Sequence, residues 1–207
     1  MSETILVTGA SAGFGQAICR RLVADGYRVI GSARRIDKLH ALQEELGEAF
    51  YPLQMDVTDL SQVDHALASL PKAWERVDVL VNNAGLALGL APAYEAEIAD
   101  WLTMIQTNIV GLTYLTRKIL PQMVERNDGY IINLGSTAGT VPYPGANVYG
   151  ASKAFVKQFS LNLRADLAGK KIRVSNIEPG LCEGTEFSSI RFKGDEKRVE
   201  ALYRDAH

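Results

Sequence analysis

The sequence has few of the residues that stabilise secreted or metal-dependent proteins. It contains two cysteines and three histidines in 207 residues, without a Cys-x-x-Cys pair or a cluster of either type. We therefore expect Cys19 and Cys182 to be reduced thiols in a cytoplasmic protein, and we expect no metal site. The histidines are scattered along the chain at His40, His65 and His207.

Long apolar runs and blocks of like charge are also missing. No apolar run approaches the roughly 20 residues of a membrane-spanning helix, and the N-terminus lacks the cationic start and apolar core of a signal peptide. The formal net charge is −2, and no block of basic residues is present. These absences predict a cytoplasmic protein without a nucleic-acid or membrane partner.

What the sequence does have is a regular alternation of strand-like and helix-like segments. The apolar strand-like segments lack the polar alternation of a half-exposed sheet, which is typical of parallel strands covered on both faces. They lie at residues 4–8, 28–33, 50–55, 77–81, 130–134 and 172–177. The sequence predicts an α/β protein with a doubly wound parallel sheet. Because we find no linker, residues 1–207 are predicted to form one domain.

A glycine-rich turn connects the first predicted strand to the first predicted helix (16–25). Unpaired N–H groups at a helix N-terminus bind anions, and small residues let a pyrophosphate approach the backbone. The turn therefore predicts a dinucleotide site, although a tight turn that binds nothing is the alternative. The residues concerned are Gly9, Ser11, Ala12, Gly13, Phe14 and Gly15.

Two arginines follow the second predicted strand, where an acidic residue would hydrogen-bond the ribose 2′-hydroxyl of NAD. Arg34 and Arg35 occupy this place, and the first acidic residue, Asp37, comes later. Guanidinium groups suit a 2′-phosphate, which a carboxylate would repel. The pair favours NADP over NAD; the alternative is two solvated arginines that open the next helix.

Tyr149 and Lys153 are four residues apart in a segment (146–168) with a helical pattern. Residues at this spacing lie on one helix face, and an ammonium beside a phenol lowers the pKa of the phenol. Such a tyrosine could exchange a proton with an alcohol or a carbonyl whose oxygen Ser136 holds, provided that a hydride carrier is present. An ordinary pair on a helix surface is the alternative.

Polar residues and glycines follow the other predicted strands as well. Because ligands of open α/β sheets bind outside the carboxyl ends of the strands, these segments are expected to converge on one crevice. The residues are Asp56, Val57, Asn83, Ser136, Pro179 and Gly180. This convergence makes a chance origin of the Tyr149–Lys153 pair improbable.

Together these motifs resemble the short-chain dehydrogenase/reductase family, in the family's order and along essentially the whole chain. They are Thr8-Gly9-x-x-x-Gly13-x-Gly15, Asn82-Asn83-Ala84-Gly85, Asn108, Ser136, Tyr149-x-x-x-Lys153 and Pro179-Gly180. The resemblance implies a Rossmann-type sheet with strand order 3-2-1-4-5-6. It also implies a catalytic tetrad of Asn108, Ser136, Tyr149 and Lys153.

The resemblance further implies a role for each site residue. Tyr149 would act as acid and base, and Ser136 would orient the substrate carbonyl. Lys153 would bind the nicotinamide ribose and lower the Tyr149 pKa, while Asn108 would hold a water that links Lys153 to solvent. The residues expected to line the nucleotide site beyond the glycine turn and the arginines are Asp56, Val57, Asn83, Pro179, Gly180 and Thr185.

Within this family the sequence is most similar to bacterial NADP-dependent 3-hydroxy acid dehydrogenases. The similarity lies in the glycine turn, in Asn147-Val-Tyr149 and in the stretch from Glu178 to Gly194. It implies serine, allo-threonine, 3-hydroxypropionate or a semialdehyde as substrate. A carboxylate substrate needs a cation, so Arg191 and Lys193 are candidate substrate clamps; a solvated loop is the alternative.

Two other functions remain open: a carbonyl reductase with another substrate, and a dinucleotide-sensing regulator without catalysis. The complete tetrad argues against the regulator. Members of the family commonly carry a further helix and a seventh strand, so we expect that the C-terminal end of the domain is missing from this sequence. The resemblance also implies a homo-oligomer, a tetramer.

Overall fold

The computed structural model describes residues 3–182 and 186–204. Its centre is one parallel sheet with the strand order β3-β2-β1-β4-β5-β6. The fold class and the strand order expected from the sequence are thus confirmed. The strands are β1 (Thr4–Thr8), β2 (Arg28–Ala33), β3 (Phe50–Gln54), β4 (Val79–Asn82), β5 (Gly129–Leu134) and β6 (Ile172–Ile177).

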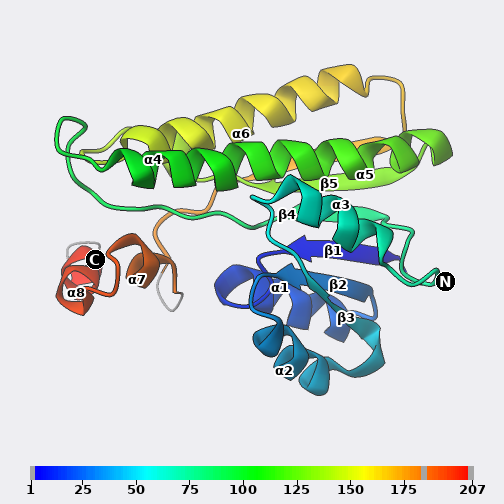
Figure 1. Cartoon of the computed structure of the whole chain (residues 1–207). Coiled ribbons are helices and arrows are strands. Elements are labelled where there is room, and N and C mark those ends of the chain that lie inside the picture. Colours follow the sequence, from blue (N-terminus) through cyan, green and yellow to red (C-terminus); the bar gives the residue numbers. More distant parts are fainter. Residues whose placement is uncertain (1–2, 183–185, 205–207) are drawn as a thin grey trace.

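Helices cover both faces of the sheet (Figure 1). One face carries α1 (Gly13–Ala24) and α2 (Ile36–Leu46), and the other carries α3 (Leu60–Ala68), α5 (Leu112–Arg126) and α6 (Asn147–Asp166). The helical stretch from Ile98 to Arg126 is divided into α4 (Ile98–Ile105), a π-helical segment (Gln106–Gly111) and α5. In Figure 1 the three parts form one long rod beside α6.

The core consists of two layers, one on each side of the sheet. Leu6, Ile30, Leu80 and Ile131 are register partners on four adjacent strands, and all four are fully buried under α3, α5 and α6. Their neighbours along the strands, such as Val7, face α1 and α2. Because successive residues of a strand point to opposite faces, a strand buried on both sides must be apolar throughout.

A chain of buried polar side chains fastens α5 and α6 to the sheet. Asn82 at the end of β4 donates from its amide to Thr116 of α5 (3.0 Å) and to Asn133 of β5 (2.9 Å). Asn133 in turn donates to Ser160 of α6 (2.9 Å). All four side chains are buried, and buried polar groups stabilise only when they are satisfied, so this network fixes where both helices lie.

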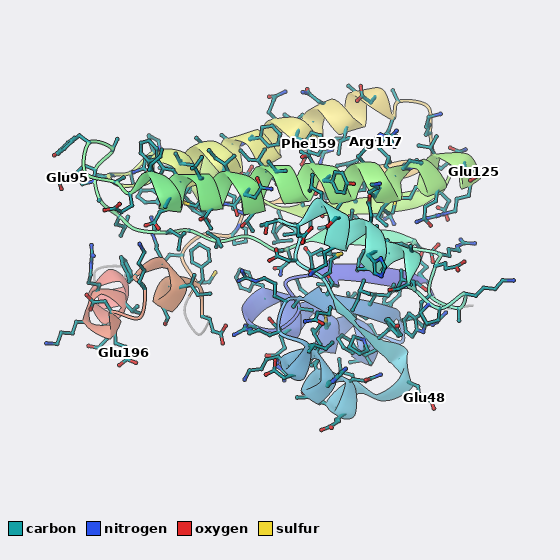
Figure 2. All side chains as sticks on the ribbon, viewed as in Figure 1. Glu48, Glu95, Arg117, Glu125, Phe159 and Glu196 are labelled. Carbon is teal, nitrogen blue, oxygen red and sulfur yellow. The ribbon has the colours of Figure 1, made fainter. Side chains whose placement is uncertain are left out.

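The chain after β6 forms two short helices, α7 (Phe187–Arg191) and α8 (Glu196–Arg204). Both lie apart from the sheet, on the side toward which β1 points (Figure 1). Figure 2 shows charged side chains such as Glu48, Glu125 and Glu196 extending from the outside of the ribbon, and all three are exposed. Among the described residues, no helix combines the length and the apolarity needed to cross a membrane.

Candidate active site

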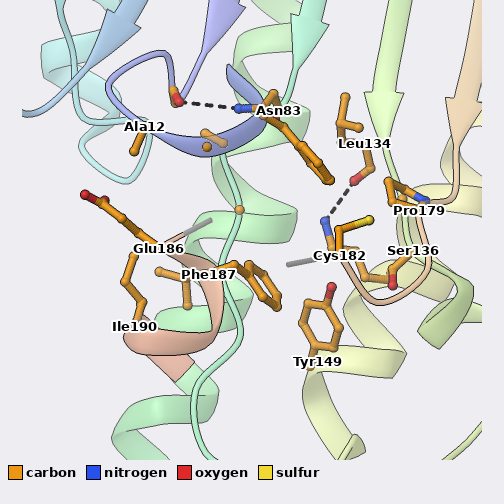
Figure 3. A pocket seen from close by; sticks show the side chains of 18 of the residues that line it. Ala12, Asn83, Leu134, Ser136, Tyr149, Pro179, Cys182, Glu186, Phe187 and Ile190 are labelled. Carbon is orange, nitrogen blue, oxygen red and sulfur yellow. Dashed lines mark hydrogen bonds between the residues drawn. The ribbon is translucent and has the colours of Figure 1, made fainter. Parts of the chain in front are cut away.

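The carboxyl ends of the strands enclose a cavity of about 240 Å³. It lies between the glycine turn after β1, the loops after β4 and β5, the start of α6, and the segment after β6 (Figure 3). The structure thereby brings together most residues that the sequence assigned to the site. Those lining this cavity are Gly9, Ser11, Ala12, Gly13, Phe14, Arg35, Asn83, Ser136, Tyr149, Lys153, Pro179 and Gly180.

A second cavity of about 690 Å³ extends from the first toward the ends of β2 and β3. Gly9, Ser11 and Arg35 line both cavities, so the two form neighbouring parts of one crevice. The predicted residues that line only the second are Arg34, Asp56, Val57 and Lys193. Thr185, also predicted, lies outside the described residues.

The glycine turn has the geometry of an anion site. Helix α1 begins at Gly13, its N-cap residue Ala12 provides no side-chain acceptor, and no acidic residue lies in its first turn. Gly9 (φ 68°) and Gly13 (φ 53°) adopt left-handed conformations that favour glycine. Since the N–H groups of a first helical turn lack intrahelical acceptors, this turn fits a phosphate of a dinucleotide.

Asn83 and Thr8 hold the glycine turn in place. The Asn83 amide donates to the carbonyl of Thr8 (2.7 Å), and the Thr8 hydroxyl accepts from the N–H groups of Asn83 (3.0 Å) and Ala84 (2.9 Å). Gly15 does not line either cavity; a Cβ there would lie 2.2 Å from the carbonyl oxygen of Gly9. Glycine at this position therefore lets α1 pack against the turn.

Arg35 is exposed and lines both cavities. Its guanidinium donates to the Ser11 hydroxyl (3.1 Å) and forms an ion pair with Glu186 (2.8 Å). Arg34 is exposed, and its carbonyl accepts from the Gln54 amide (3.2 Å). The guanidinium of Arg35 and the hydroxyl of Ser11 thus form a donor pair beside the glycine turn that fits a phosphate group.

The proposed reacting groups come from α6 and from the end of β5. The Tyr149 and Lys153 side chains are buried, and the Lys153 ammonium donates to the carbonyl of Leu134 at the end of β5 (2.8 Å), the bond drawn beside Leu134 in Figure 3. The ammonium lies 5.9 Å from the centre of the Tyr149 ring. Ser136 follows β5, and its hydroxyl accepts from the N–H of Ala138 (3.2 Å).

The acid–base properties of this pair differ from the expectation. Burial raises the pKa of Tyr149, while a hydrogen bond with Ser136 and the charge of Arg191 lower it in part. Burial lowers the pKa of Lys153 from 10.5 to about 8. We expected the ammonium to lower the Tyr149 pKa, but desolvation disfavours the charged form of both groups and dominates here.

Asn108 lies in the π-helical segment, outside both cavities, and forms hydrogen bonds with residues near the site. Its amide oxygen accepts from the N–H of Leu86 (3.0 Å), and its amide nitrogen donates to the Leu86 carbonyl (2.9 Å) and to Ser152 (3.0 Å). A Cβ on Gly85 would lie 3.2 Å from the Asn108 amide oxygen and 3.3 Å from the Lys153 nitrogen. Glycine at position 85 therefore lets both tetrad members lie close to this loop.

The two candidate substrate clamps lie in different surroundings. Arg191 is buried, donates to the carbonyl of Gly89 (3.1 Å) and to the Tyr143 hydroxyl (3.0 Å), and lies 5.6 Å from the Tyr149 ring centre. Lys193 is largely exposed and forms an ion pair with Asp100 (2.9 Å). Within residues 3–182 and 186–204, no carboxylate forms an ion pair with Arg191.

Three neighbours of Tyr149 were not expected from the sequence. The Phe187 ring lies 5.8 Å from the Tyr149 ring, Tyr143 accepts from Arg191, and Ser152 accepts from Asn108. Phe187 begins the five-residue helix α7 and Tyr143 lies in the irregular segment before α6; neither segment has a periodic pattern, so no sequence signal identifies these residues. Ser152 stands inside the Tyr-x-x-x-Lys motif itself, and that position was the available signal.

Asn147 shapes the start of α6. It has a left-handed backbone (φ 24°), its side-chain oxygen accepts from the Trp101 indole (3.1 Å), and its amide donates to the carbonyl of Ala91 (3.1 Å). These bonds fasten α4 and the loop after β4 to the helix that carries Tyr149.

In the described part of the chain, no group of three His, Cys, Asp or Glu residues could hold a metal ion.

The lowered pKa of Lys153 predicts a pH dependence of stability. Between about 8 and 10.5 Lys153 is more protonated in the unfolded chain than in the folded chain, so its contribution to the stability rises with pH in this window. The cost of burying the ammonium is fully present below this window. The variant Lys153→Met lacks the titrating group, so the stability of the wild type relative to the variant should increase across the window. Urea unfolding at several pH values measures the difference in the free energy of unfolding between the two proteins. A difference that stays constant across the window would contradict the lowered Lys153 pKa.

Comparison with known proteins agrees with this geometry. Residues 3–195 match the short chain dehydrogenase family. A "Probable NADP-dependent dehydrogenase" of Haemophilus influenzae is 60% identical over 204 residues, which are 99% of this chain and 81% of the relative. The "NADP-dependent 3-hydroxy acid dehydrogenase YdfG" of Escherichia coli O6:H1 is 58% identical over 201 residues, 97% of this chain and 81% of the relative.

A solved structure shows the same arrangement of the chain. The closed form of serine dehydrogenase complexed with NADP+ superimposes with a TM-score of 0.95 at 57% sequence identity, covering 97% of this chain and 81% of that one. The family match spans nearly the whole chain, and the identities are far above the level at which only the fold is shared. The glycine turn, the Asn83 loop and the helix with Tyr149 and Lys153 agree with this match. The chain therefore belongs to the short-chain dehydrogenase family.

Proposed function

We propose that this protein is an NADP-dependent oxidoreductase that transfers a hydride between the nicotinamide and a small 3-hydroxy acid or its semialdehyde. The position of Arg191 is the observation that favours an acid as the substrate. Its buried guanidinium lies 5.6 Å from the Tyr149 ring, and no described carboxylate pairs with it. A buried cation beside the reacting phenol fits a substrate carboxylate.

The cofactor supplies the hydride donor or acceptor, and the residues of this chain supply binding and proton transfer. The Tyr149 hydroxyl exchanges a proton with the substrate oxygen, and the Ser136 hydroxyl holds that oxygen in place. Because burial raises the Tyr149 pKa, the phenol is protonated at neutral pH and is ready to act as an acid on a carbonyl. In this protonation state the phenol can donate its proton to the carbonyl oxygen of a semialdehyde when that carbonyl is reduced.

Two features support NADP as the cofactor. Arg35 and Ser11 form a donor pair beside the glycine turn, and Arg34 lines the neighbouring part of the crevice. No acidic residue directly follows β2 in the sequence, and a 2′-phosphate bound to Arg35 would take the place of the Glu186 carboxylate that pairs with this arginine. The relatives named above, which carry NADP in their names, add independent support.

A carbonyl reductase with a different substrate is the second candidate, since the apolar residues Leu86, Leu181, Phe187 and Ile190 form much of the cavity wall. A dinucleotide-sensing regulator is the third. The close packing of Asn108, Ser136, Tyr149 and Lys153 argues against a protein that has lost catalysis. A rate matrix with NADP or NAD against serine, allo-threonine, 3-hydroxypropionate and secondary alcohols separates the first two candidates.

A cytoplasmic location and a homo-oligomeric, tetrameric assembly complete the proposal. Ile98, Leu102 and Ile105 form an exposed apolar stripe along α4. The partly exposed Phe155 stacks on Phe159 of α6 with ring centres 5.8 Å apart. Apolar faces of this kind on two adjacent helices support burial against another copy of the chain.

The acid–base role of Tyr149 predicts the effect of removing its hydroxyl. Tyr149→Phe keeps the ring and its packing, but it cannot transfer a proton. We expect kcat to fall by a factor of about 10² to 10⁴, with NADPH binding unchanged in a fluorescence titration. Substantial remaining turnover would contradict this role. A wild-type protein that binds NADPH tightly yet oxidises it with no carbonyl substrate would favour the regulator.

The phosphate-reading role of the arginines predicts a change in cofactor preference. Replacing Arg34 and Arg35 by alanine removes charge-assisted hydrogen bonds, so NADPH affinity should fall about 10- to 100-fold. NADH affinity should change little. Arg21→Ala is a matched control because Arg21 is exposed and pairs with Asp25 away from the crevice. Equal losses for NADPH and NADH would refute the role.

The carboxylate-binding role of Arg191 predicts a selective loss. Arg191→Gln retains donors for the carbonyl of Gly89 but removes the positive charge. The KM for serine should rise about 10- to 100-fold, while the KM for an uncharged aldehyde should change little. An unchanged KM for serine would end this assignment.

Lys193→Ala tests the second clamp residue. A rise in the KM for serine comparable to that of Arg191→Gln would mean that both cations bind the carboxylate.

A further inference from the structure

We propose that Ser152 is a positioning residue, which holds the Tyr149–Lys153 turn of α6 against Asn108 and so fixes the alignment of the reacting groups. The proposal rests on the oxidoreductase function proposed above. Ser152 is almost fully buried and lies outside both cavities, so it touches neither a substrate nor a cofactor. Its effect must therefore pass through the residues that it bonds.

The hydroxyl of Ser152 connects two helices through two hydrogen bonds. It accepts from the Asn108 amide nitrogen (3.0 Å) and donates to the carbonyl oxygen of Tyr149 (2.7 Å). The first bond reaches the π-helical segment between α4 and α5, and the second returns to α6. One side chain thus joins the backbone of the catalytic tyrosine to the amide of another tetrad member.

The hydrogen bonds from Leu86 through Asn108 and Ser152 to Tyr149 form a series, in which each bond determines the orientation of the next. Asn108 accepts from the N–H of Leu86, so its oxygen must face Leu86 and its nitrogen must donate to the Leu86 carbonyl and to Ser152. Because Ser152 receives that bond, its own proton is directed to the Tyr149 carbonyl. Removing the hydroxyl leaves a buried amide donor without one of its acceptors, and it abolishes the only described direct side-chain hydrogen bond from Asn108 to α6.

The contact between the two helices lies next to the ammonium. The Asn108 amide oxygen and the Lys153 nitrogen both lie close to Gly85, since a Cβ there would lie 3.2 and 3.3 Å from these atoms. Ser152 precedes Lys153 directly, so a displacement of this turn moves the ammonium relative to Asn108 and to the Leu134 carbonyl. Small displacements of reacting groups reduce rates strongly while leaving the fold intact.

The same helix offers a matched control at Ser160. Ser160 is buried to the same extent as Ser152, accepts from the Asn133 amide (2.9 Å), and donates to the carbonyl of Val156 (2.7 Å). The two serines therefore have equivalent hydrogen bonds and differ in what they join. Ser152 joins α6 to the tetrad, whereas Ser160 joins α6 to the sheet two turns further along.

The experiment compares Ser152→Ala with Ser160→Ala in the full chain. Both variants should show a similar fall in Tm, because each leaves one buried amide donor unpaired. Only Ser152→Ala should lose kcat, by about 10- to 100-fold, with the KM for NADPH within about twofold and a shifted pH profile of kcat. Equal loss of kcat in both variants, or a kcat of Ser152→Ala close to that of the wild type, would overturn the proposal.

A double-mutant cycle with Asn108→Ala tests the route of the effect. If Ser152 acts through Asn108, Ser152→Ala should slow the Asn108→Ala variant far less than it slows the wild type. The same slowing in both backgrounds would refute the route. A wild type without turnover would instead refute the proposed function, so the two failures are distinguishable.

Discussion

The burial of the Lys153 ammonium is the constraint on which the arrangement of the site depends. A cation removed from water loses much of its solvation and must be compensated by polar partners or lose its charge. Its described hydrogen bond goes to the carbonyl of Leu134, the last residue of β5. This bond ties the helix that carries Lys153 to the end of β5, and Tyr149, one turn earlier, lines the cavity.

The same physical rule explains why the other site residues gather there. Backbone groups at the ends of parallel strands have no ladder partner, so each loop after a strand must satisfy them with side chains or with a ligand. Thr8 and Asn83 do this between β1 and β4, and Asn108 does it for the loop that begins at Gly85. The polar residues of the site are thus partly structural, and only the groups left facing the cavity remain for chemistry.

Much of this could be predicted from the sequence, because the decisive signals are local. The strand-like runs, the glycine turn and the spacing of Tyr149 and Lys153 each depend on a few consecutive residues, and the strand order follows from the family resemblance. The pKa values could not be predicted in the same way, because desolvation depends on how completely the fold closes around a group. For that reason the expected direction of the Tyr149 pKa differed from what the structure gives. Tyr143 and Phe187 approach Tyr149 only through tertiary folding, which no local pattern encodes.

Arg191 illustrates how a local sequence signal and the tertiary fold together determine the role of a residue. The sequence suggests it only as a cation after the sixth strand, whereas the fold buries it between Gly89, Tyr143 and Tyr149. Its charge lowers the Tyr149 pKa, so it opposes the effect of burial on the phenol. A carboxylate that neutralised this guanidinium would weaken that effect and favour the protonated phenol. In the proposed function, binding of the acid would therefore help to keep the proton on Tyr149 that reduction of its carbonyl requires.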